Sequence, residues 1–232
     1  MKYSYENIAK MIDHSLLTPT LTDTQLDEGC RLALAYDVAT VCIMPYYLKR
    51  CTAILAGSAV KPSTTIGFPH GGHATSVKVA EAAQALDDGG QELDMVVNIS
   101  KVLSGDWAYV RDDIQAVTDV VRERGAKVKV IFENCYLAND DKVRLCEICG
   151  DVAVDWVKTS TGFGQQEGRF YGATDDDLRL MKANISPRVQ LKAAGGVRTL
   201  QRMLEMRELG CTRVGATATE AIMEEARRTL PQ

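Results

Sequence analysis

Two lysines at the ends of short apolar runs are the residues of this chain with the clearest chemical potential. Lys158 ends the run Val-Asp-Trp-Val-Lys, and Lys192 ends the run Val-Gln-Leu-Lys. A buried ammonium group is costly unless it is paired or loses its proton, and a second nearby cation lowers its pKa. A neutral amine attacks carbonyl compounds and forms Schiff bases. The two lysines together therefore predict imine chemistry.

A simpler interpretation exists for each lysine alone. A lysine at a strand end usually extends its ammonium group to solvent, and the hydroxyls that follow Lys158 could serve only the turn. Glycines follow both lysines, as Gly162 after the first and Gly195-Gly196 after the second. Backbone amides at glycine turns are suited to phosphate, although a Gly-Gly pair can also be a plain helix-entry turn. The combination favours a small phosphorylated carbonyl substrate.

Apolar runs alternate with helical patterns along the whole chain, which predicts parallel strands joined by crossover helices. The expected strands are Met11–Ser15, Thr40–Met44, Thr64–Phe68, Glu92–Asn98, Val128–Glu133, Val154–Thr159, Val189–Ala193 and Thr212–Gly215. The expected helices include Leu26–Tyr36, Ser76–Asp88, Tyr109–Arg124, Asp175–Ala183 and Leu200–Leu209.

This count of strands predicts a single (β/α)8 TIM barrel over residues 1–232, with no linker or repeat that divides it. A short extra helix at Tyr3–Lys10 would cover the N-terminal end of the barrel. An open doubly wound sheet is the alternative, although the first strand lacks the glycine-rich turn typical of that fold. The polar loop Gly164–Thr174 follows the Lys158 strand and is expected at the active face.

Alternation within the strands predicts which side chains enter the barrel. Aliphatic residues on one face of each strand meet the helices, so the residues between them point inward. Those predicted to point inward are Glu92, Asp94, Lys129, Glu133 and Lys192. A lumen with acids and lysines is a charged network leading to a catalytic mouth. Within it Asp94 could either neutralise a lysine or relay protons through a water.

Histidines and cysteines offer a less favoured metal alternative. His14, His70 and His73 could ligate zinc for a metal-dependent aldolase, but the last two lie in a His-Gly-Gly-His turn without helical i, i+4 spacing. Cys146 and Cys149 form a single C-x-x-C within a helical pattern and are interpreted as two buried thiols. We therefore expect neither a metal nor a cofactor.

The composition excludes several classes of function. A formal net charge of −4 gives no electrostatic basis for binding nucleic acid or an anionic membrane. No apolar run approaches the roughly 18 residues of a membrane span. The count of 7 cysteines is odd and the residues are scattered, which argues against a disulfide framework and predicts a cytoplasmic protein.

With these residues in view, nearly the whole chain resembles the deoxyribose-phosphate aldolases, class I aldolases of the (β/α)8 type. The most specific segments are Lys158-Thr-Ser-Thr-Gly-Phe and Lys192-Ala-Ala-Gly-Gly-Val-Arg-Thr, in this order. The resemblance extends over Ile12–Leu17, Val41–Pro45, Thr65–Gly71, Val77–Glu81, Glu92–Asn98, Val128–Glu133 and Arg213–Ala216.

The resemblance implies roles for individual residues. Lys158 would form the Schiff base, Lys192 would lower its pKa, and Asp94 would relay protons. Asp13 and Ser15 would line the site. A further group would lie near the substrate or its phosphate: Cys42, Thr161, Gly162, Gly195, Gly196, Gly215 and Thr217. Of these Cys42 would be a nearby thiol that is not catalytic.

Three features depart from the family pattern. Relatives often carry adjacent serines after the last strand, where this chain has Thr217-Ala218. The loop after Lys158 is longer than usual and contains Arg169, which could contact substrate or belong to a plain solvated loop. Some relatives end in a tyrosine that reaches the active site, whereas this chain ends Leu-Pro-Gln232.

The resemblance implies a metal-independent aldolase that cleaves 2-deoxy-D-ribose 5-phosphate to D-glyceraldehyde 3-phosphate and acetaldehyde, assembled as a homodimer. Within the same chemistry the alternative is a Schiff-base aldolase for another phosphorylated sugar. The alternative from another class is a sugar-phosphate-binding barrel without turnover. Lys158, Lys192 and Asp94 argue against the latter, because phosphate binding alone needs none of them in the lumen.

Overall fold

The computed structural model describes residues 3–166 and 168–231, and its parallel strands close into a barrel. The order around the barrel is β1-β10-β9-β6-β5-β4-β3-β2. The barrel strands are β1 (Ile12–Leu16), β2 (Thr40–Ile43), β3 (Lys61–Ile66), β4 (Glu92–Val96), β5 (Lys127–Ile131), β6 (Trp156–Lys158), β9 (Gln190–Ala194) and β10 (Cys211–Ala216). The pairing of β1 with β10, Asp13 opposite Gly215, confirms the barrel and rules out the open sheet.

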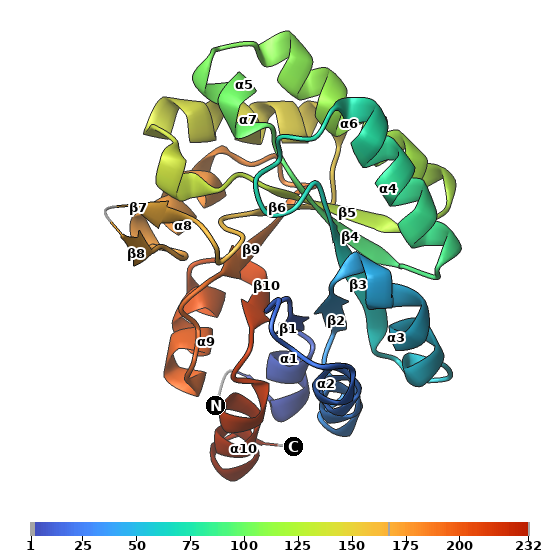
Figure 1. Ribbon diagram of the computed structural model, residues 1–232. Helices are drawn as coiled ribbons and strands as arrows, with labels where there is room; N and C mark the ends of the chain where they lie inside the picture. The colour runs from blue at the N-terminus through green and yellow to red at the C-terminus, as the bar shows by residue number, and fades with distance from the viewer. Residues whose placement is uncertain (1–2, 167, 232) are drawn as a thin grey trace.

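Helices surround the barrel (Figure 1). They are α1 (Tyr5–Ala9), α2 (Asp23–Ala35), α3 (Leu48–Leu55), α4 (Thr75–Asp87), α5 (Ile99–Leu103), α6 (Trp107–Glu123), α7 (Asn139–Val152), α8 (Asp175–Asn184), α9 (Leu200–Glu208) and α10 (Thr219–Thr229). Two single 3-10 turns, η1 (Pro45–Tyr47) and η2 (Asn134–Tyr136), follow β2 and β5.

Side-chain caps fix where several of these helices begin. Thr22 caps α2 and forms a reciprocal capping box with Gln25, while Asp106 caps α6. Thr174 caps α8 and Thr199 caps α9, each accepting a hydrogen bond from a backbone N–H of the first turn. The caps set the helix starts beside the carboxyl ends of the strands, where loops can carry a site.

The hydrophobic core lies between the strands and the helices. It is built from the outward-facing strand residues, such as Val128 and Val130 of β5, packed on apolar helix faces. The short predicted helix is present as α1, which packs against α10 and whose Tyr5 N–H donates to the Pro231 carbonyl at 2.8 Å. The two ends of the described chain therefore lie close together (Figure 1).

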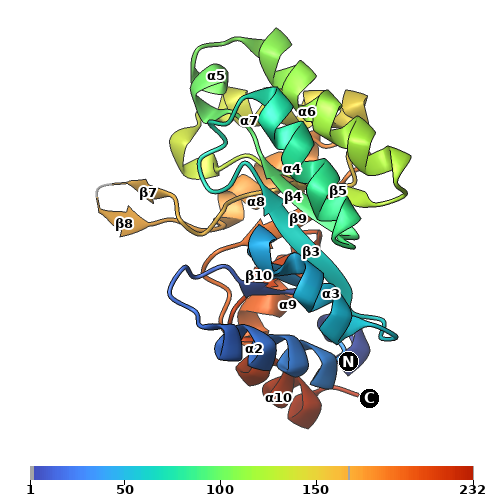
Figure 2. The same cartoon turned by 45° about the vertical axis from the view of Figure 1, so that its right-hand side comes forward.

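The long loop after β6 contains a short hairpin. The sequence predicts a long polar loop over Gly164–Thr174, and within it the chain forms a small antiparallel pair, β7 (Gln165–Gln166) with β8 (Arg169–Phe170). Glu167, between them, lies outside the described residues. Figure 2 shows this hairpin projecting outward on the side where the loops after the barrel strands gather.

Candidate active site

Asp94 on β4 lies at the centre of the buried ionic network in the lumen. Its Oδ2 is 2.7 Å from the Nζ of Lys158, the last residue of β6, and 2.7 Å from the Nζ of Lys192 in β9. All three side chains are almost completely buried. Because Lys158 and Lys192 are register partners on neighbouring strands, the barrel itself brings their ammonium groups to one carboxylate oxygen.

The network continues toward the N-terminal end of the barrel. Lys129 Nζ lies 2.9 Å from Asp94, 2.8 Å from Glu92 and 3.3 Å from Asp13. Asp13 also accepts a hydrogen bond from Lys192. Arg213 closes the network with contacts of 2.8 Å to Asp13 and 2.9 Å to Glu92. The predicted charged lumen is thus confirmed, and it extends further than the paired lysines.

The network contains one more cation than anions. It joins the cations Lys129, Lys158, Lys192 and Arg213 to the carboxylates Asp13, Glu92 and Asp94. A buried excess charge is unfavourable, so loss of one proton brings the network to neutrality. The amine that most readily loses it is the best nucleophile in the site.

The pKa shifts identify that amine as Lys158. Burial lowers its pKa, Asp94 opposes this effect, and the Lys192 ammonium lowers it further. In contrast, the pKa of Lys192 is raised, because Asp13 and Asp94 outweigh its own burial. The pKa of Asp94 is held well below its usual range by Lys129, Lys158 and Lys192 despite burial. Two lysines with similar sequence surroundings therefore have opposite pKa shifts.

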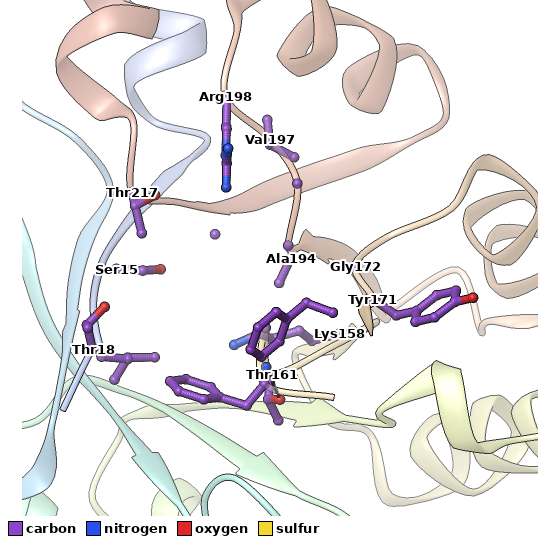
Figure 3. A pocket seen from close by; sticks show the side chains of 17 residues that line it. Ser15, Thr18, Lys158, Thr161, Tyr171, Gly172, Ala194, Val197, Arg198 and Thr217 are labelled. Carbon is purple, nitrogen blue, oxygen red and sulfur yellow. Dashed lines mark hydrogen bonds between the residues drawn. The ribbon is translucent and has the colours of Figure 1, made fainter. Parts of the chain in front are cut away.

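A cavity of about 450 Å³ opens above this network at the carboxyl ends of the strands. Lys158 belongs to its lining, whereas Asp94 and Lys192 lie beneath it. Figure 3 shows Ser15 and Thr217 on the side of the cavity opposite Tyr171, whose ring points away from it. The remaining wall is formed by Leu17, Thr18, Thr161, Gly162, Phe163, Phe170, Gly172, Ala194, Gly195, Gly196, Val197, Arg198 and Gly215.

A model of the "DeoC/LacD family aldolase" family matches residues 7–217. The chain is 60% identical over 228 residues to the deoxyribose-phosphate aldolase of Rhodopirellula baltica, covering 98% of this chain and 92% of the relative. It is 44% identical over 223 residues to the deoxyribose-phosphate aldolase of Thermococcus gammatolerans, covering 95% of this chain and 97% of the relative. The chain belongs to the DeoC/LacD family of aldolases.

Solved structures agree with this assignment. A tetrameric deoxyribose-phosphate aldolase from Aeropyrum pernix superposes with a TM-score of 0.87 at 26% identity, covering 97% of this chain and 92% of that chain. A protein from Coccidioides immitis gives a TM-score of 0.90 at 35% identity, covering 97% and 87%. The recognised resemblance and the predicted barrel are both confirmed.

In this aldolase the predicted site residues fall into two layers. The upper layer lines the cavity and contains Ser15, Lys158, Thr161, Gly162, Gly195, Gly196, Gly215 and Thr217. The lower layer is buried in the lumen and contains Asp13, Cys42, Asp94 and Lys192. Burial raises the pKa of the Cys42 thiol, so this cysteine is held in its protonated form.

The lining also contains residues that were not predicted as site residues. Arg198 points toward the open space between Thr217 and Ala194 (Figure 3). The sequence feature that could have identified Arg198 is its position directly after Gly195-Gly196-Val197, in a loop expected to bind phosphate. Arg169 is exposed and is absent from the cavity lining, and a contact between Arg169 and substrate stays a hypothesis. The hairpin instead provides Phe170, Tyr171 and Gly172.

The histidines do not come together. His14 is buried beside α10, where its Nδ1 lies 2.8 Å from Thr219 Oγ1, while His70 and His73 are exposed after β3. Among residues 3–166 and 168–231, no group of three or more His, Cys, Asp or Glu side chains is arranged to hold a metal ion. Cys146 and Cys149 are two buried free thiols on α7, as predicted. In the same part of the chain no helix is long and apolar enough to cross a membrane.

Proposed function

We propose that residues 1–232 form one catalytic domain that cleaves 2-deoxy-D-ribose 5-phosphate to D-glyceraldehyde 3-phosphate and acetaldehyde through a Schiff base on Lys158. The observation that carries the proposal is a lysine with a lowered pKa in the lining of a cavity whose other wall is built of glycine loops. The deoxyribose-phosphate aldolases of R. baltica and T. gammatolerans, similar along almost their full length, support this choice of substrate.

The first step uses the neutral amine of Lys158. It attacks the aldehyde carbon of the open-chain sugar phosphate, and the carbonyl oxygen departs as water to leave a protonated imine. The imine withdraws electrons from the neighbouring carbon–carbon bond. Cleavage needs a proton removed from the hydroxyl next to that bond, after which glyceraldehyde 3-phosphate leaves. The enamine that remains takes up a proton and is hydrolysed to acetaldehyde and free Lys158.

During these steps Asp94 would relay protons and Lys192 would supply a positive charge beside Lys158. Asp94 contacts both lysines at 2.7 Å, so it is the carboxylate best placed to relay a proton between the substrate, through a water, and Lys192. Lys192 remains an ammonium group, since Asp13 and Asp94 raise its pKa. Its positive charge favours the neutral form of Lys158 before attack.

The phosphate group would lie against Gly162, Gly195, Gly196 and Gly215, which line the cavity. Gly162, Gly195 and Gly196 have positive φ angles of 89°, 85° and 84°, a backbone conformation that brings amide groups toward a ligand and that side chains rarely allow. The first turns of α9 and α10 begin nearby and favour an anion there. The Arg198 guanidinium adds a donor suited to phosphate.

Borohydride trapping tests the proposal directly. Reduction in the presence of acetaldehyde should add one ethyl group to the protein, and peptide mapping should place it on Lys158. Modification at another lysine alone, or none, would reject the assignment. A parallel dialysis against a chelator should leave the cleavage rate unchanged, whereas a loss restored by zinc would favour the histidine-based alternative.

We further propose a cytoplasmic homodimer. All cysteines of the chain are free thiols, which is the state expected in a reducing compartment. The relative from A. pernix is described as tetrameric, so the number of subunits has to be measured for this chain. Light scattering of the purified protein distinguishes a dimer from a tetramer by mass.

A further inference from the structure

Glu133 is a buried acid that the proposed reaction does not use. It lies two residues beyond the end of β5, is 1% exposed, and adopts a left-handed backbone conformation with φ +58°. A non-glycine residue in this conformation is strained and is retained where the surrounding structure requires it. Strand alternation predicts that Glu133 points into the lumen with Lys129. The left-handed turn ends that alternation, and the carboxylate meets the loop after Lys158 instead.

The hydrogen bonds described for the Glu133 carboxylate are all with Thr161, in one turn of the active face. The Thr161 N–H donates to both carboxylate oxygens at 3.2 Å, and the Thr161 hydroxyl donates to Oε2 as well. The same hydroxyl accepts a hydrogen bond from the Phe163 N–H at 2.9 Å. The carboxylate thus fixes both ends of the turn that contains Gly162, a predicted phosphate ligand.

The backbone around Glu133 is also fixed relative to Lys158. The Phe132 N–H donates to the Lys158 carbonyl at 3.0 Å, and the Asn134 N–H donates to the Thr159 carbonyl at 2.9 Å. On the other side, a Cβ added to Gly164 would lie only 2.9 Å from Glu133 Oε1 and 2.6 Å from Cys135 Sγ. Glu133 is therefore enclosed between the lysine strand and the start of the hairpin.

We propose that Glu133 is a positioning residue that holds the Thr161–Gly162 turn at a fixed place beside Lys158. The inference rests on the proposed function, because the turn matters only if it receives the phosphate group. The carboxylate suits the task since both of its oxygens accept hydrogen bonds and Thr161 presents two donors. When the turn is already fixed, binding of the phosphate places the aldehyde carbon at Lys158 without a further loss of backbone conformational entropy.

Kinetics with a phosphorylated and a non-phosphorylated sugar test this role. In Glu133→Ala the KM for 2-deoxyribose 5-phosphate should rise by about tenfold, the factor expected for losing a charge-assisted hydrogen bond. For 2-deoxyribose, which has no phosphate, the KM should change by less than about twofold. Glu133→Gln keeps one acceptor oxygen and should restore part of the loss. The matched control is Glu147→Ala, which replaces an exposed acid on α7 and should leave the KM for both sugars unchanged.

Thr161→Val provides a second route if Glu133→Ala does not fold. It keeps the backbone donor, removes the hydroxyl that links Phe163 to Glu133, and should raise the KM for the phosphorylated sugar alone. The double variant should have the same KM for the phosphorylated sugar as Glu133→Ala, because both substitutions break the same contact between Glu133 and Thr161. Equal losses with both sugars, or no loss, would overturn the positioning role. Imine trapping on Lys158 in the wild type is the separate measurement on which the proposed function depends.

Discussion

Lys158 differs from the other cations of the lumen in the direction of its pKa shift. Burial and Lys192 lower its pKa, whereas the pKa values of Lys129, Lys192 and Arg213 are raised by the carboxylates around them. The difference follows from position. Among the carboxylates that the structure describes, Lys158 forms an ion pair with Asp94 alone, and Asp94 is shared with Lys129 and Lys192. The lowered pKa of Lys158 is therefore a property of the network.

We expect Lys192→Met to move the acid limb of the pH–rate profile to higher pH. The substitution removes a cation that lowers the pKa of Lys158 and also leaves Asp94 with one fewer partner, so both effects raise that pKa. A smaller fraction of Lys158 is then neutral at any given pH below its pKa. Measuring kcat/KM against pH checks the shift. A uniform loss of rate without a shift would indicate a general acid instead.

His14 makes a contribution to stability that depends on pH. Burial lowers its pKa from 6.5 to about 4, so the folded state binds fewer protons than the unfolded state between these values. The contribution is complete above pH 6.5 and is lost as the pH falls toward 4. Both proteins should lose unfolding free energy when the pH falls from 7 to 4.5. We expect this loss to be about 2.5 kcal/mol smaller in His14→Gln than in the wild type. Urea unfolding at both pH values measures this; parallel losses would contradict it.

At the scale of elements, strand alternation predicted the inward lysines and acids because it is a local geometric rule. It failed where a strand ended. The strand expected at Thr64–Phe68 instead covers Lys61–Ile66, since Gly67 turns the chain with φ +63°. Glu133, beyond the end of β5, contacts the Thr161 turn rather than the ion pairs of Lys129. The β7–β8 hairpin has too few residues in each strand for its alternation to be visible in the sequence.

The loops after β6 and β9 place two arginines in different settings. Arg198 lines the cavity, whereas Arg169 is exposed on the hairpin and does not. We expect Arg198→Ala to raise the KM for the phosphorylated sugar by about tenfold, as loss of a charge-assisted phosphate contact would. The matched variant Arg169→Ala should leave this KM within about twofold. The reverse result would restore Arg169 as the phosphate contact that the sequence allowed.

For the whole molecule, the barrel fold could be predicted from the sequence because eight apolar runs alternate with helical patterns. The pairing of charges across the lumen could not be predicted. Arg213 meets Glu92 across the lumen at 2.9 Å, although 121 residues separate them in the chain. Only closure of the barrel brings these residues together. Arg198 could not be assigned to the cavity for the same reason, since its direction depends on how two loops meet.

The lumen network should also be visible in the stability of the whole molecule. Lys129→Met removes a fully buried cation that lies within 3.3 Å of three carboxylates, and the loss of this shared ion-pair partner should cost about 3–5 kcal/mol. For a chain of this size the melting temperature should fall by roughly 10 °C. The control Lys101→Met breaks an exposed pair with Asp106 and should cost about 1 kcal/mol or less. A small effect at Lys129 would show that the network has relaxed around the loss.

The pairing of β1 with β10 has a consequence for the synthesis of the protein. Asp13 is synthesised before Lys192, to which it is hydrogen-bonded and which follows 179 residues later. A growing chain therefore carries an open sheet edge at β1 until β10 has been synthesised, and until then Asp13 lacks Lys192 or Arg213. Partly synthesised chains cannot assemble the charge network around Lys158, and their exposed edges are the surfaces that a chaperone would need to cover.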